Sequence, residues 1–216
     1  MNIMKFSILC NDYFMKINQL KTIILILLIP VILNSCKNPF ATREPELPTE
    51  GRTSWRLPTD PMIVLQNMTA AIEEKNVENY MKCLVDSVNL FHFTPDQYQA
   101  STNAGIFEQW SLAHEQSYIN KAFTSIPDDS ARSLKFLNIQ RNEFPDSALV
   151  RADYEIALHH ILAPAFPIIG KGQIDFVLTR RFGYWVISRW KDFETKVDPT
   201  ATRVPSWSTI KASFIK

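Results

Sequence analysis

The sequence predicts an α+β domain in which three N-terminal helices pack on a strongly curved antiparallel sheet. Apolar residues recur at helical spacing in the first half of the domain, whereas the second half contains four segments rich in β-branched and aromatic residues. Helices followed by a run of strands are typical of α+β folds in which the helices cover one face of the sheet.

The first half contains three predicted helices. Thr59 or Asp60 can cap a helix that has Pro61 at its first position, and apolar residues then recur as far as Ile72. A second helix, a brief strand and a third helix are expected at residues 76–85, 90–96 and 106–123.

The second half contains four predicted strands, at residues 133–144, 148–161, 172–181 and 184–194. Strict alternation from Trp185 through Ile187 would turn Trp190 away from the core. We therefore expect a β-bulge between Ile187 and Trp190, which returns the indole to the core and helps to bend the sheet.

The C-terminal tail, residues 196–216, contains a further short helix. Trp207, Ile210 and Phe214 follow one another at steps of three and four residues, and Lys211 is expected to lie off this stripe. Three large apolar side chains on one face predict that the helix docks either on its own domain or on a partner.

Residues 1–35 have the features of a secretory signal peptide. Lys16 and Lys21 precede an apolar run of about eleven residues, which is shorter than the roughly 20 residues that a membrane-spanning helix needs. A buried helix, a plain signal peptide and an uncleaved anchor are the alternatives. Translation could begin at Met1 or at Met15.

The end of this run, LNSC at residues 33–36, resembles the lipobox of bacterial lipoprotein precursors. In that family the cysteine is acylated on its sulfur, the peptide is cut just before it, and the new amine is usually acylated. The resemblance implies that Cys36 carries palmitate or similar chains. It also implies a protein anchored by lipid in the bacterial cell envelope, facing the periplasm or the exterior, in the inner or the outer membrane.

Residues 36–58 form a proline-rich tether with neither helical nor strand periodicity. Trp55 is the exception, because a lone aromatic residue in such a linker often docks on the domain it serves. The compact domain is expected to span residues 59–195.

Charge and cysteine content exclude several functions. The whole chain has a net charge of +1, and loss of the signal peptide brings it to about −1, so no basic excess suits nucleic acid. Cys83 is the one cysteine left after removal of the signal peptide and lipidation of Cys36. Its apolar setting predicts a buried thiol, with neither a disulfide nor a zinc site.

The order of elements and the closing segment YWVISRWKDFE resemble the nuclear transport factor 2-like superfamily, which has a cystatin-like α+β cone. Trp185, Ile187, Trp190 and Asp192 match the pattern of its final strand. The resemblance covers most of residues 60–194 and implies a pocket between sheet and helices. It implies no single function, since the superfamily contains isomerases, dehydratases, hydrolases, transport adaptors and lipoproteins.

Four residues are candidates for the pocket. Tyr154 and His160 lie on the predicted inner face of one strand, and Trp110 and His114 lie on the third helix, where they could equally be packing residues. His160 could likewise be a core histidine with a simple structural hydrogen bond.

The carboxylates of the middle strands should face water. Alternation places Asp153, Glu155 and Asp175 opposite the apolar face, which argues against a buried acid pair for proton transfer. His159 and His160 are neighbours on a predicted strand and therefore point to opposite faces, so no metal site is expected. No cofactor is expected either.

These observations favour a non-enzymatic binding domain. It would take a small apolar ligand in the cone or an envelope protein on the open sheet face, and a homodimer through the sheet is a further expectation. The alternative is an isomerase- or dehydratase-like enzyme that uses His160 and Tyr154.

Overall fold

The computed structural model describes residues 54–86, 91–195 and 203–215. The expected signal peptide, Cys36 and most of the tether lie outside these residues. The described residues belong to one compact unit, Arg52–Lys216. No helix within the described ranges has the length and apolar character needed to cross a bilayer.

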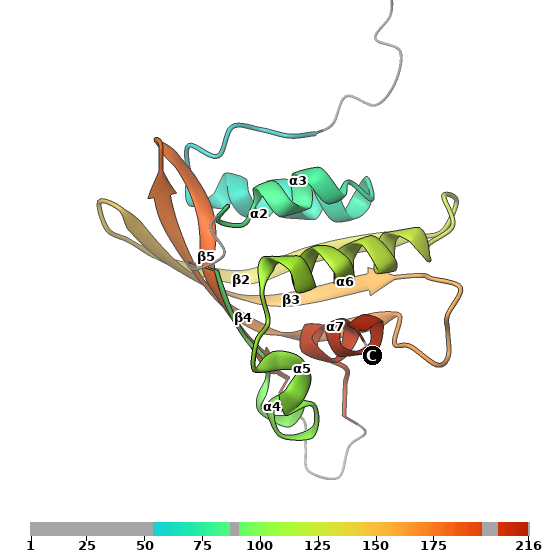
Figure 1. Cartoon of the computed structure of the whole chain (residues 1–216). Helices are drawn as coiled ribbons and strands as arrows, with labels where there is room; N and C mark the ends of the chain where they lie inside the picture. The colour runs from blue at the N-terminus through green and yellow to red at the C-terminus, as the bar shows by residue number, and fades with distance from the viewer. Residues whose placement is uncertain (1–53, 87–90, 196–202, 216) are drawn as a thin grey trace, which may run out of the picture. The chain divides into compact units, whose positions relative to one another are not determined.

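A five-stranded sheet forms one layer of the domain (Figure 1). Its spatial order is β1-β5-β4-β3-β2, and β1 pairs parallel to β5 while the other pairs are antiparallel. The sheet is therefore mixed and not antiparallel as expected, because the edge strand β1, which lies within the helical half of the chain, runs in the same direction as β5. The strands are β1 (His92–Thr94), β2 (Arg132–Glu143), β3 (Ser147–Leu158), β4 (Ile169–Arg181) and β5 (Tyr184–Glu194).

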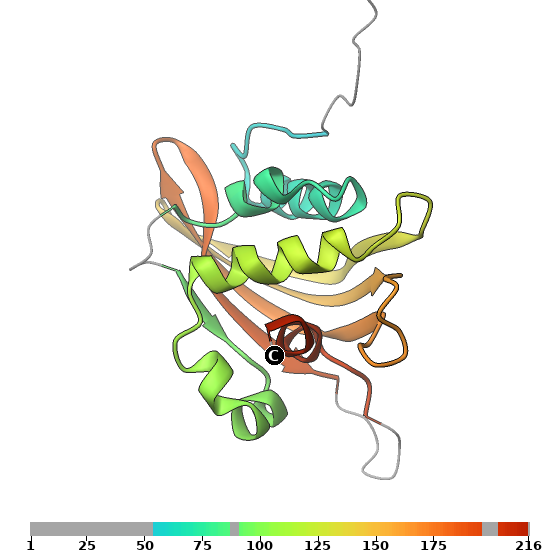
Figure 2. The same cartoon turned by 45° about the vertical axis from the view of Figure 1, so that its right-hand side comes forward.

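Helices form the second layer. Figures 1 and 2 show α2, α3, α6 and α7 lying across one face of the sheet, with α4 and α5 below them. The α+β class is confirmed. Helices α2, α3 and α6 correspond to expected ones, whereas α4 was not expected. The helices are α2 (Pro61–Glu73), α3 (Val77–Lys82), α4 (Gln97–Thr102), α5 (Ala104–Phe107), α6 (Leu112–Thr124) and α7 (Trp207–Ile215).

The expected helix over residues 106–123 is interrupted. Ser111 is the N-cap of α6, and its backbone N–H donates to Nδ1 of His114 at 3.3 Å, so a new helix begins there. Phe107, Trp110 and His114 therefore do not form one continuous helical stripe. Trp110 is buried in the break, whereas His114 is only half-buried at the helix start.

The bulge in β5 is confirmed. Leu178 pairs with Ile187 and Val177 pairs with Arg189, so Ser188 is the extra residue. Beyond it the alternation is restored with Trp190 inside and Arg189 exposed.

The end of the expected tether lies on the domain. Trp55 packs against the core, and Arg56 exchanges two hydrogen bonds with the Asn67 side chain, at 2.9 and 2.7 Å. The backbone N–H of Trp185 donates to the carbonyl of Pro58 at 2.8 Å. The docking expected of Trp55 is confirmed, and these contacts fix the residues just before α2 to α2 itself and to β5.

Candidate functional site

Helix α7 fills the space between the sheet and the other helices. Trp207, Ile210 and Phe214 are all buried, and the rings of Trp207 and Trp190 meet edge to face with centroids 4.6 Å apart. The helix expected in the tail is confirmed, and it docks on its own domain. The resemblance implied a pocket between the sheet and the helices. In this structure that space is filled by the side chains of α7.

Lys211 lies inside this packing, and the expectation that it would lie off the apolar stripe is wrong. Its ammonium donates to both carboxylate oxygens of Glu115 on α6, at 2.7 and 2.8 Å, and neither side chain is exposed. Glu115 also accepts from the Tyr80 hydroxyl at 2.6 Å and from the Trp110 indole N–H at 2.7 Å. The carboxylate is therefore bound by donors from α3, from α7 and from the segment just before α6.

Aromatic rings enclose the ammonium of Lys211. Its nitrogen lies 3.5 Å from the ring centroid of Trp190 and 3.9 Å from that of Phe93, a cation–π geometry. Burial lowers the pKa of Lys211 to about 8, against the opposing effect of the Glu115 charge. The cage and the ion pair together hold the middle of α7 in place.

A second polar cluster holds the start of α7. Tyr154 donates to Asp192 at 2.8 Å and accepts from the backbone N–H of Trp207 at 2.7 Å. Ser208 donates to the same carboxylate from its backbone N–H at 2.7 Å and its hydroxyl at 2.5 Å. Burial raises the pKa of Asp192 to about 6 and raises that of Tyr154 well above its usual range.

His160 lies apart from this cluster. β3 ends at Leu158, so His160 is in a loop and not on the strand where it was expected; its backbone N–H turns back to the Leu158 carbonyl. The ring packs edge to face on Phe166 and Phe214, and Nε2 lies 3.3 Å from the Pro167 carbonyl oxygen. Nδ1 has no hydrogen-bond partner among the described residues.

The four candidate residues thus have different surroundings. Tyr154 binds Asp192, Trp110 binds Glu115, His114 caps α6 and His160 packs on the end of α7. The buried positions of Glu115 and Asp192 are what the sequence reasoning missed. The bulge in β5 contained the signal for Asp192, because restoring Trp190 to the inner face also turns Asp192 inward.

The outer face of β3 and β4 is polar, as alternation predicted. Arg151 binds Asp175 through two hydrogen bonds of 2.6 Å, and Lys171 binds Glu155 at 2.5 Å. A hollow of about 890 Å³ lies over this face, lined largely by charged and amide side chains that already bind one another. It offers few free groups to a ligand.

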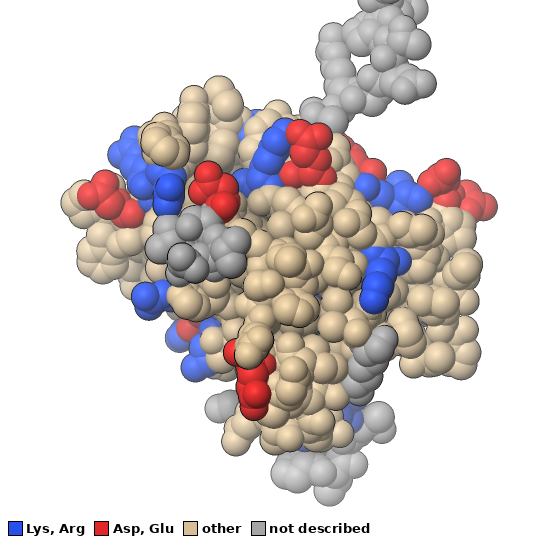
Figure 3. All heavy atoms as spheres, viewed as in Figure 1, with Lys and Arg blue, Asp and Glu red and all other residues tan. Residues whose placement is uncertain are grey.

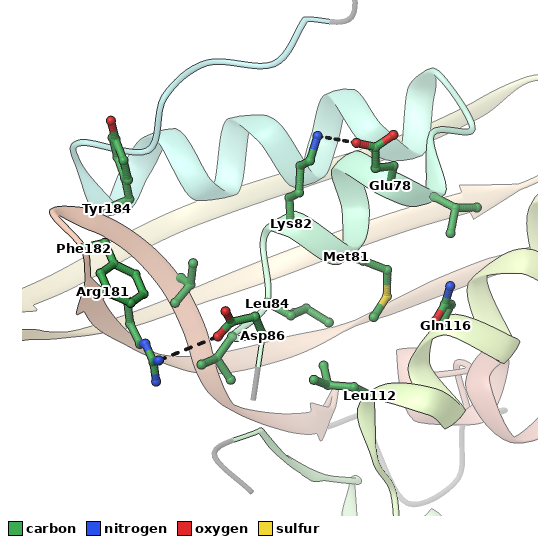
Figure 4. A pocket seen from close by; sticks show the side chains of 13 residues that line it. Glu78, Met81, Lys82, Leu84, Asp86, Leu112, Gln116, Arg181, Phe182 and Tyr184 are labelled. Carbon is green, nitrogen blue, oxygen red and sulfur yellow. Dashed lines mark ion pairs between the residues drawn. The ribbon is translucent and has the colours of Figure 1, made fainter. Parts of the chain in front are cut away.

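An apolar groove lies outside the space that α7 fills, between α3, the start of α6 and the β4–β5 hairpin (Figure 4). Its volume is about 700 Å³. Figure 3 shows few charged side chains across the middle of the face seen there, which is viewed as in Figure 1. The apolar side chains that line the groove are Val77, Met81, Leu84, Val85, Leu112, Phe182 and Val186.

Ion pairs border this groove. Lys82 binds Glu78 at 2.5 Å along α3, and Arg181 lies 3.9 Å from Asp86 across the opening (Figure 4). The charges therefore compensate each other at the rim, and the floor is left apolar. Such a lining suits an uncharged, apolar ligand.

Within residues 54–86, 91–195 and 203–215, no three histidine, cysteine or carboxylate side chains converge on one point. Cys83 is buried, as expected, and burial raises the pKa of its thiol. It is therefore not activated as a nucleophile.

Comparison with known proteins shows likeness in fold. No family model matches the chain, and no curated protein matches it. A Mycobacterium tuberculosis protein of unknown function is similar over 71% of this chain and 83% of its own, with 14% identity and a TM-score of 0.50.

Two other similar structures have TM-scores below 0.5. An NTF2-like protein of unknown function from Pseudomonas putida aligns over 65% of this chain and 88% of its own, with 9% identity and a TM-score of 0.48. A protein with a cystatin-like fold from Nostoc punctiforme aligns over 64% and 89%, with 10% identity and a TM-score of 0.43.

Proposed function

We propose that this chain is a lipid-anchored envelope protein whose nuclear transport factor 2-like domain binds a small apolar ligand in the outer groove. The observation that carries the proposal is the position of the free space. The interior of the cone is filled by α7, whereas the groove beside α3 has the size and lining of a ligand pocket.

The anchor rests on the N-terminal sequence. The LNSC segment supplies the acylated cysteine, and the residues from Lys37 to Thr53 supply the tether. Two or three acyl chains give stable attachment, whereas one gives only marginal attachment. The ligand-binding domain would then work at the surface of an envelope membrane.

The interior polar groups fit a structural role better than catalysis. Tyr154 is bound to Asp192 and to the backbone of Trp207, so its hydroxyl is occupied on both its donor and acceptor sides. His160 packs at the far end of α7, and no hydrogen bond joins it to Tyr154 in the described structure. For an isomerase- or dehydratase-like reaction at Tyr154, α7 would have to move out of the interior to make room for a substrate.

Native mass spectrometry tests the proposal. The chain from Lys37 onward, secreted into the envelope of its own host and purified gently, should retain an apolar small molecule. Met81→Glu places a charge in the groove from a half-buried position on α3, so it should abolish co-purification. Leu149→Glu is the matched control, because Leu149 is exposed on the outer face of β3 and away from the groove.

The two variants separate the outcomes. Loss of the bound mass in Met81→Glu alone supports the groove. Equal retention in both variants, or a ligand released only when α7 is deleted, would place the binding site elsewhere and overturn the proposal.

A further inference from the structure

Four exposed apolar residues gather at one end of the domain, and we call this surface the aromatic edge. Its members come from three separate segments of the chain. The exposed fractions are 61% for Leu57, 62% for Phe144, 89% for Phe182 and 40% for Tyr184.

Hydrogen bonds between these segments place them together. The backbone N–H of Trp185 donates to the carbonyl of Pro58 at 2.8 Å, which joins the β4–β5 hairpin to the segment before α2. The backbone N–H of Arg180 donates to the carbonyl of Asp146 at 3.0 Å, which joins it to the β2–β3 hairpin. Figures 1 and 2 both place the two hairpins at the same end of the sheet.

The backbone at the tip of the β4–β5 hairpin adopts an unfavourable conformation. Arg181 pairs with Tyr184, so Phe182 and Gly183 form a two-residue turn in which both have positive φ, 50° and 87°. Asn, Asp or Gly suit the first of these positions, whereas a bulky aromatic residue there is an outlier. Phe182 is strained and almost fully exposed, which indicates a functional role for its ring at the tip.

We propose that the aromatic edge docks into the interfacial region of a phospholipid bilayer, as a second and noncovalent contact with the membrane that holds the lipid anchor. This inference rests on the proposed anchoring. About 17 residues separate Cys36 from Ser54, so at up to ~3.3 Å each they keep the domain within ~56 Å of the anchor. At such a tether length the effective concentration of membrane near the domain is high. A surface with only weak affinity for the bilayer would therefore be bound for much of the time.

The chemistry of the edge favours a bilayer interface. Aromatic rings prefer the boundary between headgroups and acyl chains, and arginines beside them can direct their guanidinium groups towards water. The Arg181 guanidinium lies 5.7 Å from the Phe182 ring centroid, and that of Arg180 lies 6.0 Å from the Trp185 ring. The Asp86 carboxylate lies 3.9 Å from the Arg181 guanidinium and offsets its charge, so apolar insertion and not net charge should dominate.

Vesicle flotation tests the inference without the anchor. All the core and hydrogen bonding described above lies from Ser54 onward, so the chain starting at Lys37 keeps the whole domain. It should float with vesicles of phosphatidylethanolamine and phosphatidylglycerol at 3:1, and almost as well with phosphatidylcholine alone. Phe182→Asn combined with Phe144→Ser should lower the partition coefficient about tenfold or more, because two large apolar groups no longer enter the interface.

A matched variant controls for general loss of apolar surface. Ile161→Asn removes a side chain that is 72% exposed in the loop after β3, at the opposite end of the sheet, and should leave the partition coefficient unchanged. Phe182→Asn relieves the turn, so a lower thermal midpoint in this variant would indicate a structural role of the ring and would contradict the proposal.

The other outcomes of the flotation experiment also test the inference. No flotation of the wild-type chain, or equal flotation of the double variant, overturns the inference, as does conversion of a soluble dimer to a monomer by the double variant. Failure of the anchor is seen separately, because fractionation of the full chain reports on Cys36 whereas flotation of the chain from Lys37 does not.

Discussion

The ammonium of Lys211 on α7 and the carboxylate of Glu115 on α6 form an ion pair with N–O distances of 2.7 and 2.8 Å, and both side chains are fully buried. The pair connects the C-terminal helix to the helical layer. Removal of one partner leaves a charge without compensation in a dry interior, which costs far more than the loss of a surface pair.

Lys211→Met should lower the free energy of unfolding by about 3–5 kcal/mol. The control is Lys121→Met, on the exposed side of α6, which should change it by no more than about 0.5 kcal/mol. Urea denaturation measures both, and the double variant Glu115→Gln with Lys211→Met should recover part of the loss. A Lys211→Met protein as stable as the Lys121→Met protein would show that α7 is not held by this pair.

Asp192 gives stability a specific pH dependence. Burial raises its pKa in the folded protein from 3.8 to about 6, so the folded state holds the proton more tightly than the unfolded state. This raised pKa therefore adds up to about 3 kcal/mol to the free energy of unfolding. The added stability is fully present below pH 4 and is lost as the pH rises through 6.

Asp192→Asn removes this titration. The difference in unfolding free energy between the two proteins should change between pH 4 and pH 6 and become flat above about pH 7. Surface carboxylates with lowered pKa values, such as Glu155, cancel in that difference because both proteins contain them. A difference that stays constant from pH 4 to pH 7 would be incompatible with a buried Asp192 of raised pKa.

Gly172 is required by close packing against Tyr154 on β3 and the backbone of β5. A Cβ added there would lie 2.6 Å from the Tyr154 hydroxyl oxygen and would also collide with the Phe193 carbonyl. Gly172→Ala should therefore cost about 1–3 kcal/mol. Gly105→Ala, in α5 with no atom near the new methyl group, should instead stabilise by about 0.5–1 kcal/mol. Thermal denaturation of the pair measures the contrast, and equal melting temperatures would contradict it.

Cys36→Ala should move the protein from the membrane fraction to the aqueous fraction and prevent cleavage of the signal peptide. The reason is that Cys36 would supply both the acylated sulfur and the processing site. Fractionation followed by intact-mass measurement of the wild type and the variant tests both points. Unchanged membrane association with unchanged mass would contradict the lipid anchor.

Local patterns predicted most of the elements. The alternation of apolar residues located all four long strands within a few residues, and it placed Asp153, Glu155 and Asp175 outside. The bulge in β5 was also predictable, because a large indole at Trp190 could not remain in water.

The features that were not predicted depend on tertiary contacts. The partner of Lys211 is Glu115, far away in the sequence, and no periodicity connects them. The break before Ser111 depends on a cap from His114 that imitates the usual glutamate. The parallel pairing of β1 with β5 is a property of topology, which three residues of strand could not specify.

The location of the bound ligand tests the central claim most directly. Methyl NMR spectra of the chain from Lys37 onward, recorded while a medium-chain alcohol such as decanol is added, distinguish the outer groove from the cone. We predict saturable shifts for the methyl groups of Met81, Leu84, Leu112 and Val186, which line the groove, and none for Ile156 on β3 or Ile210 on α7, which are buried in the interior. Saturable shifts at Ile156 and Ile210, with the groove methyl groups unchanged, would contradict the account.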